Sequence, residues 1–160
     1  MTTPPAADPG TVLRDATAAM RQGNLPGAAA LAAAAESRFR ARGDADGRMR
    51  AENLLGAVAF ETGQVGEAER FFGTALELAH GLDDSLMTAR ASNNLASVAH
   101  LTGRPDLALS LYRTALLSYQ RLGDRRGMAE TSHNLGIAFR QLRQWTEAER
   151  AAEQAVRHAE

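Results

Sequence analysis

The sequence has no cysteine and no lysine, and only 5% of its residues are aromatic. Without cysteine the chain can form no disulfide, no thiolate metal site and no cysteine nucleophile. Arginine is therefore the only permanently charged basic side chain, and the net charge is −1 at neutral pH. Because this balance creates no overall positive field, we expect neither nucleic acid nor an anionic membrane surface as a partner.

Long apolar runs are also missing, and this bears on where the protein resides. No stretch approaches the roughly 18 apolar residues that a membrane-spanning helix needs. The opening residues, MTTPPAADPG, lack the basic and apolar regions of a secretory signal. We therefore predict a soluble, cytoplasmic protein, with residues 1–10 as a disordered lead-in because proline and small residues predominate there.

The residues that are present favour helices arranged in repeats. Alanine, leucine, arginine and glutamate are abundant, and all four are good helix formers. The sequence also resembles itself at an offset of 40 residues, which indicates a repeat architecture. The positions that match at this offset are Leu55, Leu95 and Leu135; Ala68, Ala108 and Ala148; and Ala75, Ala115 and Ala155.

Each repeat is predicted to be a pair of antiparallel helices. In the second repeat the first helix runs from about Gly47 to Thr62, and Gly63 ends it with a left-handed residue. The predicted repeats are 9–48, 49–88, 89–128 and 129–160, within an array that covers 11–160. In the first repeat Asp15 stands where leucine is expected, so Val12, Leu13 and Met20 must pack instead. In the fourth, Arg143 replaces the turn glycine.

This pattern resembles the tetratricopeptide repeat. The signature pairs are Leu55-Gly56, Leu95-Ala96 and Leu135-Gly136, and the second helices carry Ala68/Phe72/Ala75, Ala108/Tyr112/Ala115 and Ala148/Ala152/Ala155. Ala152 lacks the usual aromatic ring, and the early tryptophan of the signature is absent. The 40-residue period resembles the kinesin-light-chain-like branch of the family. The resemblance implies an all-α, right-handed superhelical solenoid of about four repeats.

The resemblance also implies a concave groove that is lined by the first helix of each repeat and that binds peptides. A peptide-binding site in this groove would consist of Arg50, Asn53, Arg90, Asn93, Asn94, Ser97, His100, His133, Asn134, Ile137 and Arg140. An asparagine amide both donates and accepts, so Asn94 and Asn134 could bind the backbone of an extended peptide. The alternative is that these asparagines bind one another across neighbouring helices and hold the repeats together.

The function predicted from these residues is non-enzymatic. The four histidines form no metal-ligand pair at i, i+3 or i+4, and no phosphate loop or nucleophile motif is present, so no cofactor, metal or catalytic residue is predicted. We expect a scaffold that binds a segment of a protein partner, with a preference for acidic segments because basic residues outnumber acidic ones on the predicted face. The alternative is a sensory or regulatory module that binds a small peptide or effector and controls an output protein. The C-terminal end lacks a polar capping helix, so a partner or a second copy of the chain could cover it.

Overall fold

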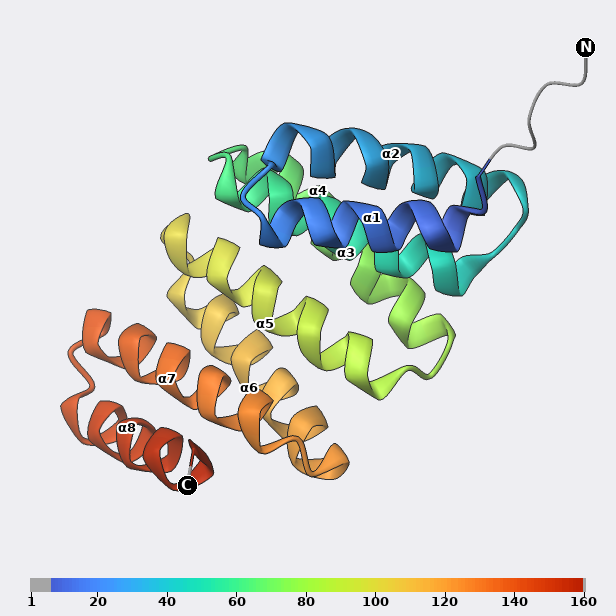
Figure 1. Cartoon of the computed structure of the whole chain (residues 1–160). Helices are drawn as coiled ribbons and strands as arrows, with labels where there is room; N and C mark the ends of the chain where they lie inside the picture. The colour runs from blue at the N-terminus through green and yellow to red at the C-terminus, as the bar shows by residue number, and fades with distance from the viewer. Residues whose placement is uncertain (1–6, 160) are drawn as a thin grey trace, which may run out of the picture. The chain divides into compact units, whose positions relative to one another are not determined.

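The computed structural model describes residues 7–159, and those residues form helices joined by short turns (Figure 1). The helices are α1 (Pro9–Arg21), α2 (Leu25–Ala41), α3 (Ala45–Glu61), α4 (Val65–Gly81), α5 (Ser85–Leu101), α6 (Pro105–Leu122), α7 (Arg125–Gln141) and α8 (Trp145–Ala159). The predicted all-α fold of paired helices is confirmed. Most of the predicted lead-in lies outside the described residues, and Pro9 and Gly10 belong to α1.

The chain divides into two compact units, Met1–Leu78 and Ala79–Glu160, which we call the N-terminal and C-terminal units. In the N-terminal unit α1 packs on α2, α2 packs on α3, and α1 also contacts α3. In the C-terminal unit α5, α6, α7 and α8 pack in succession, and α5 also contacts α7. In each unit, therefore, the first helices of neighbouring pairs lie against each other, as a tetratricopeptide-like solenoid requires.

The turns explain why the helices are so regular in length. A residue with positive φ occurs every 20 residues: Gly23, Gly43, Gly63, Asp83, Gly103, Gly123 and Arg143. Helices α3, α5 and α7 then begin after Asp44, Asp84 and Asp124, whose carboxylates each accept a hydrogen bond from a backbone N–H three residues on, at 2.9 Å. The helix pairs consequently begin at residues 45, 85 and 125, a spacing of 40.

The turn at Arg143 gives a first prediction about stability. Arg143 has φ 56°, whereas its equivalent one repeat earlier, Gly103, has φ 73° and no atom near the place of a side chain. Because the left-handed conformation costs an L-residue about 1–2 kcal/mol, we expect Arg143→Gly to raise the free energy of unfolding by about 0.5–1 kcal/mol. Gly103→Arg should lower it by a similar amount. Urea denaturation measures both variants, and effects of the same sign would contradict this account of the turns.

Large and small side chains alternate where each pair of helices meets the next. The ring of Phe39 lies against Gly47, and the ring of Tyr119 lies against Gly127, so closely in both cases that a β-carbon on the glycine would overlap the ring. At the same point between these two, Ala79 replaces the aromatic residue and Met87 replaces the glycine, and both are buried. One large side chain therefore fills each junction, although the helix that supplies it changes.

The first helix follows a different pattern from the other first helices. Val12 is buried with Phe39 and Ala51, and Leu13 and Met20 pack against the same core, as predicted. Asp15, which stands where the other repeats have leucine, is exposed on α1. The departure from the repeat pattern therefore places no charge in the core.

Candidate peptide-binding surface

The predicted groove residues of the C-terminal unit lie on two helices that contact each other, α5 and α7. Arg90, His133 and Arg140 are exposed, whereas Asn94, Ser97, His100, Asn134 and Ile137 are half-buried. We call the face formed by Arg90, Asn94, Ser97, Asn134 and Ile137 the α5–α7 face. Those of the N-terminal unit, Arg50 and Asn53, lie on α3.

Asn93 is buried, with only 5% of its surface exposed, and it joins α5 to α7. Its Oδ1 accepts hydrogen bonds from the Thr131 hydroxyl at 3.2 Å and from the Asn134 amide at 3.3 Å. These bonds are the inter-helix contact that the sequence left as an alternative. The structure thus assigns Asn93 to the packing between helices, because a peptide cannot reach a buried amide.

Asn134 has a different position, because it remains half-exposed while it donates to Asn93. An amide side chain offers two N–H donors and two acceptor lone pairs. Among the described residues Asn134 uses one donor, for Asn93, and this bond fixes the orientation of the rest of the amide. Structural contact and ligand contact are therefore compatible at this residue.

Ser97 and His100 show how the rest of α5 is fixed. The Ser97 hydroxyl donates to the Asn93 carbonyl at 3.1 Å and lies 3.1 Å from the Tyr112 hydroxyl, which then donates to Ser97. Burial raises the pKa of Tyr112, and the bond to Ser97 lowers it by a smaller amount. Within the described residues, Nδ1 of His100 is buried without a hydrogen-bond partner.

On α3, the predicted contribution of Arg50 to a basic groove is reduced by a neighbour. Its guanidinium binds Asp46, one turn earlier, through two hydrogen bonds of 3.0 and 3.1 Å. Because both partners are exposed, the pair contributes at most about 1 kcal/mol to stability. The pair does, however, offset the charge that a ligand would encounter there.

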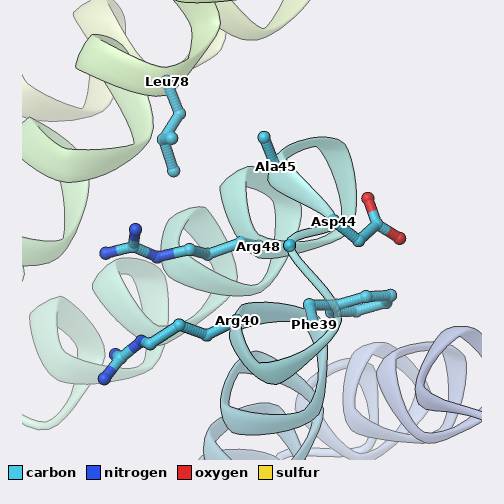
Figure 2. Close-up of a pocket in the computed structure, with 7 residues that line it drawn as sticks. Phe39, Arg40, Asp44, Ala45, Arg48 and Leu78 are labelled. Carbon is cyan, nitrogen blue, oxygen red and sulfur yellow. The ribbon is translucent and has the colours of Figure 1, made fainter.

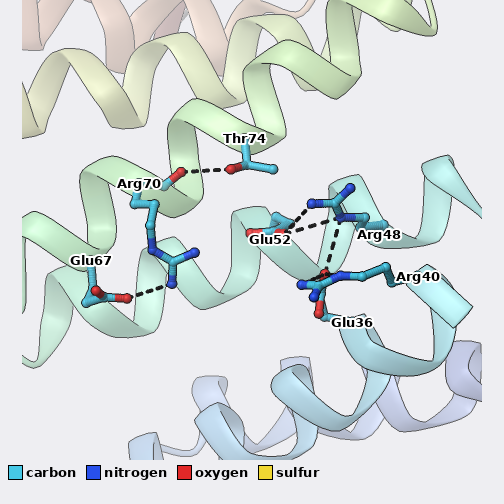
Figure 3. A network of polar contacts seen from close by, with 7 residues as sticks. All are labelled: Glu36, Arg40, Arg48, Glu52, Glu67, Arg70 and Thr74. Carbon is cyan, nitrogen blue, oxygen red and sulfur yellow. Dashed lines mark hydrogen bonds and ion pairs between the residues drawn. The ribbon is translucent and has the colours of Figure 1, made fainter.

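A cluster of buried carboxylates in the N-terminal unit was not predicted from the sequence (Figure 3). Glu36 and Glu52 are 6% and 2% exposed. Oε1 of Glu36 accepts from Arg40 at 2.6 Å and from Arg48 at 3.2 Å, and Arg48 also lies 3.5 Å from Glu52. The i, i+4 spacing of Glu36–Arg40 and Arg48–Glu52 was visible in the sequence. The approach of α2 to α3, which unites the two pairs, was not.

The two carboxylates compete for one pair of arginines. Burial raises the pKa of Glu52, the neighbouring Glu36 raises it further, and Arg48 lowers it by less. Oε2 of Glu52 has no hydrogen-bond partner among the described residues. The protonated form of Glu52 is therefore favoured in the folded state, because an unpaired buried charge is costly.

A small pocket of about 120 Å³ lies beside this cluster (Figure 2). Arg40 and Arg48 extend along it in the same direction, and Phe39, Asp44, Ala45 and Leu78 complete most of its wall. Both guanidinium groups already bind Glu36. The pocket consequently presents little uncompensated positive charge to an anion.

A larger pocket of about 400 Å³ lies between α7 and α8 in the C-terminal unit. Its lining consists of His133, Gly136, Arg140, Trp145, Ala148, Glu149 and Ala152. Two residues predicted for the groove, His133 and Arg140, thus belong to a pocket that α8 completes. Across the described residues, no group of three or more metal-ligating side chains occurs, and no helix is long and apolar enough to span a membrane.

Comparison with known proteins agrees with this arrangement of helices. A family model of the tetratricopeptide repeat matches residues 87–160, which cover most of α5 through to α8. The chain belongs to the tetratricopeptide repeat family. The prediction of the family is confirmed, and so is the kinesin-light-chain-like type, since a structure of that kind is among the similar folds described next. No match was found among the curated proteins.

Several solved structures share the tetratricopeptide fold of this chain. BtubC (BKLC) from P. vanneervenii has a TM-score of 0.86 and 23% identity, and the match covers 97% of this chain and 66% of that one. The nearly identical TPR-like repeats of a Podosopora anserina protein assigned as a kinesin light chain give 0.72 and 16%, over 94% and 74%. MamA gives 0.69 and 16%, over 95% and 78%. The present chain spans 66% of the length of BtubC.

Proposed function

We propose that this tetratricopeptide array is a non-enzymatic interaction module whose α5–α7 face binds an extended segment of a partner protein. The family supports the general role, because its repeats are typical of protein-interaction scaffolds. The observation that carries the proposal is Asn134, which is half-exposed yet held in one orientation by buried Asn93. A pre-oriented amide loses little side-chain entropy when it binds a ligand.

The spacing of the face suits an extended backbone. Neighbouring helices lie about 8–10 Å apart, and an extended chain advances about 3.3 Å per residue. Asn94 on α5 and Asn134 on α7 would therefore bind peptide groups about three residues apart in the ligand. Because backbone groups are common to every sequence, these contacts give affinity without sequence specificity.

The charges near this face supply a preference. Arg90 is exposed on α5, and His133 and Arg140 are exposed on α7, whereas Glu130 is an exposed acidic residue on α7. We expect a mild selectivity for acidic segments, which should weaken as salt screens the exposed charges.

The proposal is tested with fluorescein-labelled hexaglutamate as the probe and fluorescence anisotropy as the readout. Each asparagine hydrogen bond contributes about 0.5–1.5 kcal/mol, so Asn94→Ala combined with Asn134→Ala should weaken binding about tenfold or more. Gln154→Ala, which truncates an exposed amide on α8, is the matched control and should leave binding unchanged. Circular dichroism establishes that each variant is folded. Equal affinity of the double variant and the unmodified chain would refute the role of the asparagines.

A further inference from the structure

The pocket between α7 and α8 has an internal counterpart in the same unit. When its lining is shifted back by 40 residues, His133 corresponds to Asn93, Gly136 to Ala96, Ala148 to Ala108, Glu149 to Leu109 and Ala152 to Tyr112. The pocket is thus the surface of the last helix pair that is equivalent to one particular face of α5 and α6.

That face of α5 and α6 is the one on which α7 packs. Asn93 accepts hydrogen bonds from Thr131 and Asn134 of α7. Residues Ala96, Ala108, Leu109 and Tyr112 share a core cluster with Leu135 and Ala138 of α7. The repeat equivalence therefore shows what kind of element fits the pocket surface, namely a helix that lies along α7 and α8 as α7 lies along α5 and α6.

The pocket differs from its counterpart by the loss of an aromatic ring. In the second repeat the ring of Phe72 lies so close to Gly56 that a β-carbon on the glycine would be 2.6 Å from it. In the fourth repeat, a β-carbon on Gly136 would meet nothing nearer than the Ala148 carbonyl oxygen at 3.5 Å, because residue 152 is alanine. The space that a ring occupies in the other repeats is open here.

The rim of the pocket is amphipathic. Trp145, at the start of α8, is 63% exposed, and Val156 farther along the same helix is 60% exposed. Arg140 and Glu149 place both signs of charge beside this apolar surface. Exposed aromatic residues next to a concavity are typical of the centre of a protein interface.

We propose that the α7–α8 face docks an amphipathic helix of a partner protein, which inserts one aromatic side chain into the pocket left by Ala152. The inserted ring would lie on Gly136, beside Trp145, in the place that Phe72 takes over Gly56. Polar residues of the partner helix would meet Arg140 and Glu149 at the rim. This site is separate from the asparagine contacts of the α5–α7 face, so either can fail without the other.

A second copy of the chain is a poorer occupant. Its free first helix, α1, would have to take the place that α7 takes on α5 and α6. The residues of α1 that correspond to Asn134 and Leu135 are Arg14 and Asp15, both of which are exposed. Asp15 would then enter an apolar pocket without a partner, which is costly.

The test uses two hydrocarbon-stapled peptides with the sequence of residues 125–141, one unchanged and one carrying Leu135→Phe. Trp145 is the only tryptophan in the chain, so its fluorescence reports on the pocket. We expect a saturable change with the phenylalanine peptide and at least tenfold weaker binding of the leucine peptide. Ala152→Tyr should abolish this preference, because its ring fills the pocket. Gly136→Ala, whose β-carbon has ordinary contacts, should reduce it without affecting the fold.

Three outcomes would overturn the proposal. The first is the absence of saturable binding of either peptide. The second is an equal preference in the unmodified chain and in both pocket variants. The third is a concentration-dependent dimer in sedimentation equilibrium that Ala152→Tyr abolishes, because a second copy would then be the occupant.

Discussion

Gly127→Met is expected to lower the free energy of unfolding by about 3 kcal/mol, the upper part of the range for overpacked cores. Gly127 is buried in the first turn of α7, and a β-carbon there would overlap the ring of Tyr119. The backbone cannot easily retreat, because the Gly127 N–H donates to the Asp124 cap at 2.9 Å. Urea denaturation followed by circular dichroism measures the loss.

The decisive comparison is with a compensating change. Tyr119→Ala alone should cost about 3–5 kcal/mol, because it empties a buried site. The double variant Tyr119→Ala with Gly127→Met reproduces the arrangement of Ala79 and Met87, and it should cost less than the sum of the single changes by about 2 kcal/mol. Gly136→Ala, which meets no close atom, is the control and should be nearly neutral. Additive costs in the double variant would show that the junctions do not share one filled volume.

Arg48→Ala is expected to destabilise the N-terminal unit by about 3 kcal/mol, as is typical when one partner of a buried ion pair is removed. Arg48 joins Glu36 at 3.2 Å to Glu52 at 3.5 Å, and both carboxylates are buried. Arg50→Ala is a matched control on the same helix, because Arg50 also forms an i, i+4 ion pair, with Asp46, but in an exposed position. Its loss should cost less than about 1 kcal/mol. Equal effects of the two variants would contradict the burial argument.

The same cluster predicts a pH dependence. The pKa of Glu52 is raised in the folded state above its ordinary value of 4.5, so the folded state binds the proton more tightly than the unfolded state does. The stability that this group contributes is complete below pH 4.5 and is lost as the pH rises through the raised pKa. Because Arg48 lowers that pKa, Arg48→Ala should steepen the loss, and the deficit of the variant should shrink in acid. A deficit that grows in acid would contradict the assignment.

The repeats themselves could be predicted from the sequence because each is specified locally. A capping aspartate, a turn residue at a fixed interval and alanines on one helical face are short-range signals, and they placed α3 and α6 to within a few residues. Arg143 was recognised as a departure, and the structure gives it the left-handed backbone that the missing glycine implied.

Contacts between helices could not be predicted in the same way. The sequence offered two roles for the asparagines, and the approach of α7 to α5 decided one of them by burying Asn93 beneath Asn134. The meeting of Glu36 with Arg48, twelve residues apart on different helices, depends on the same kind of approach. The pocket above Gly136 was also hidden, although the absence of a ring at Ala152 was its visible sign.

The most direct test of the proposed function is an NMR titration of the ¹⁵N-labelled chain with unlabelled hexaglutamate. We predict saturable chemical-shift changes that are confined to the α5–α7 face, with the Asn94 and Asn134 side-chain amides among those that shift most. Exposed residues of α6 such as Arg113 and Leu117 should not respond. Shifts at all exposed arginines alike, or no saturable shift on α5 and α7, would contradict the assignment of this face as the binding surface.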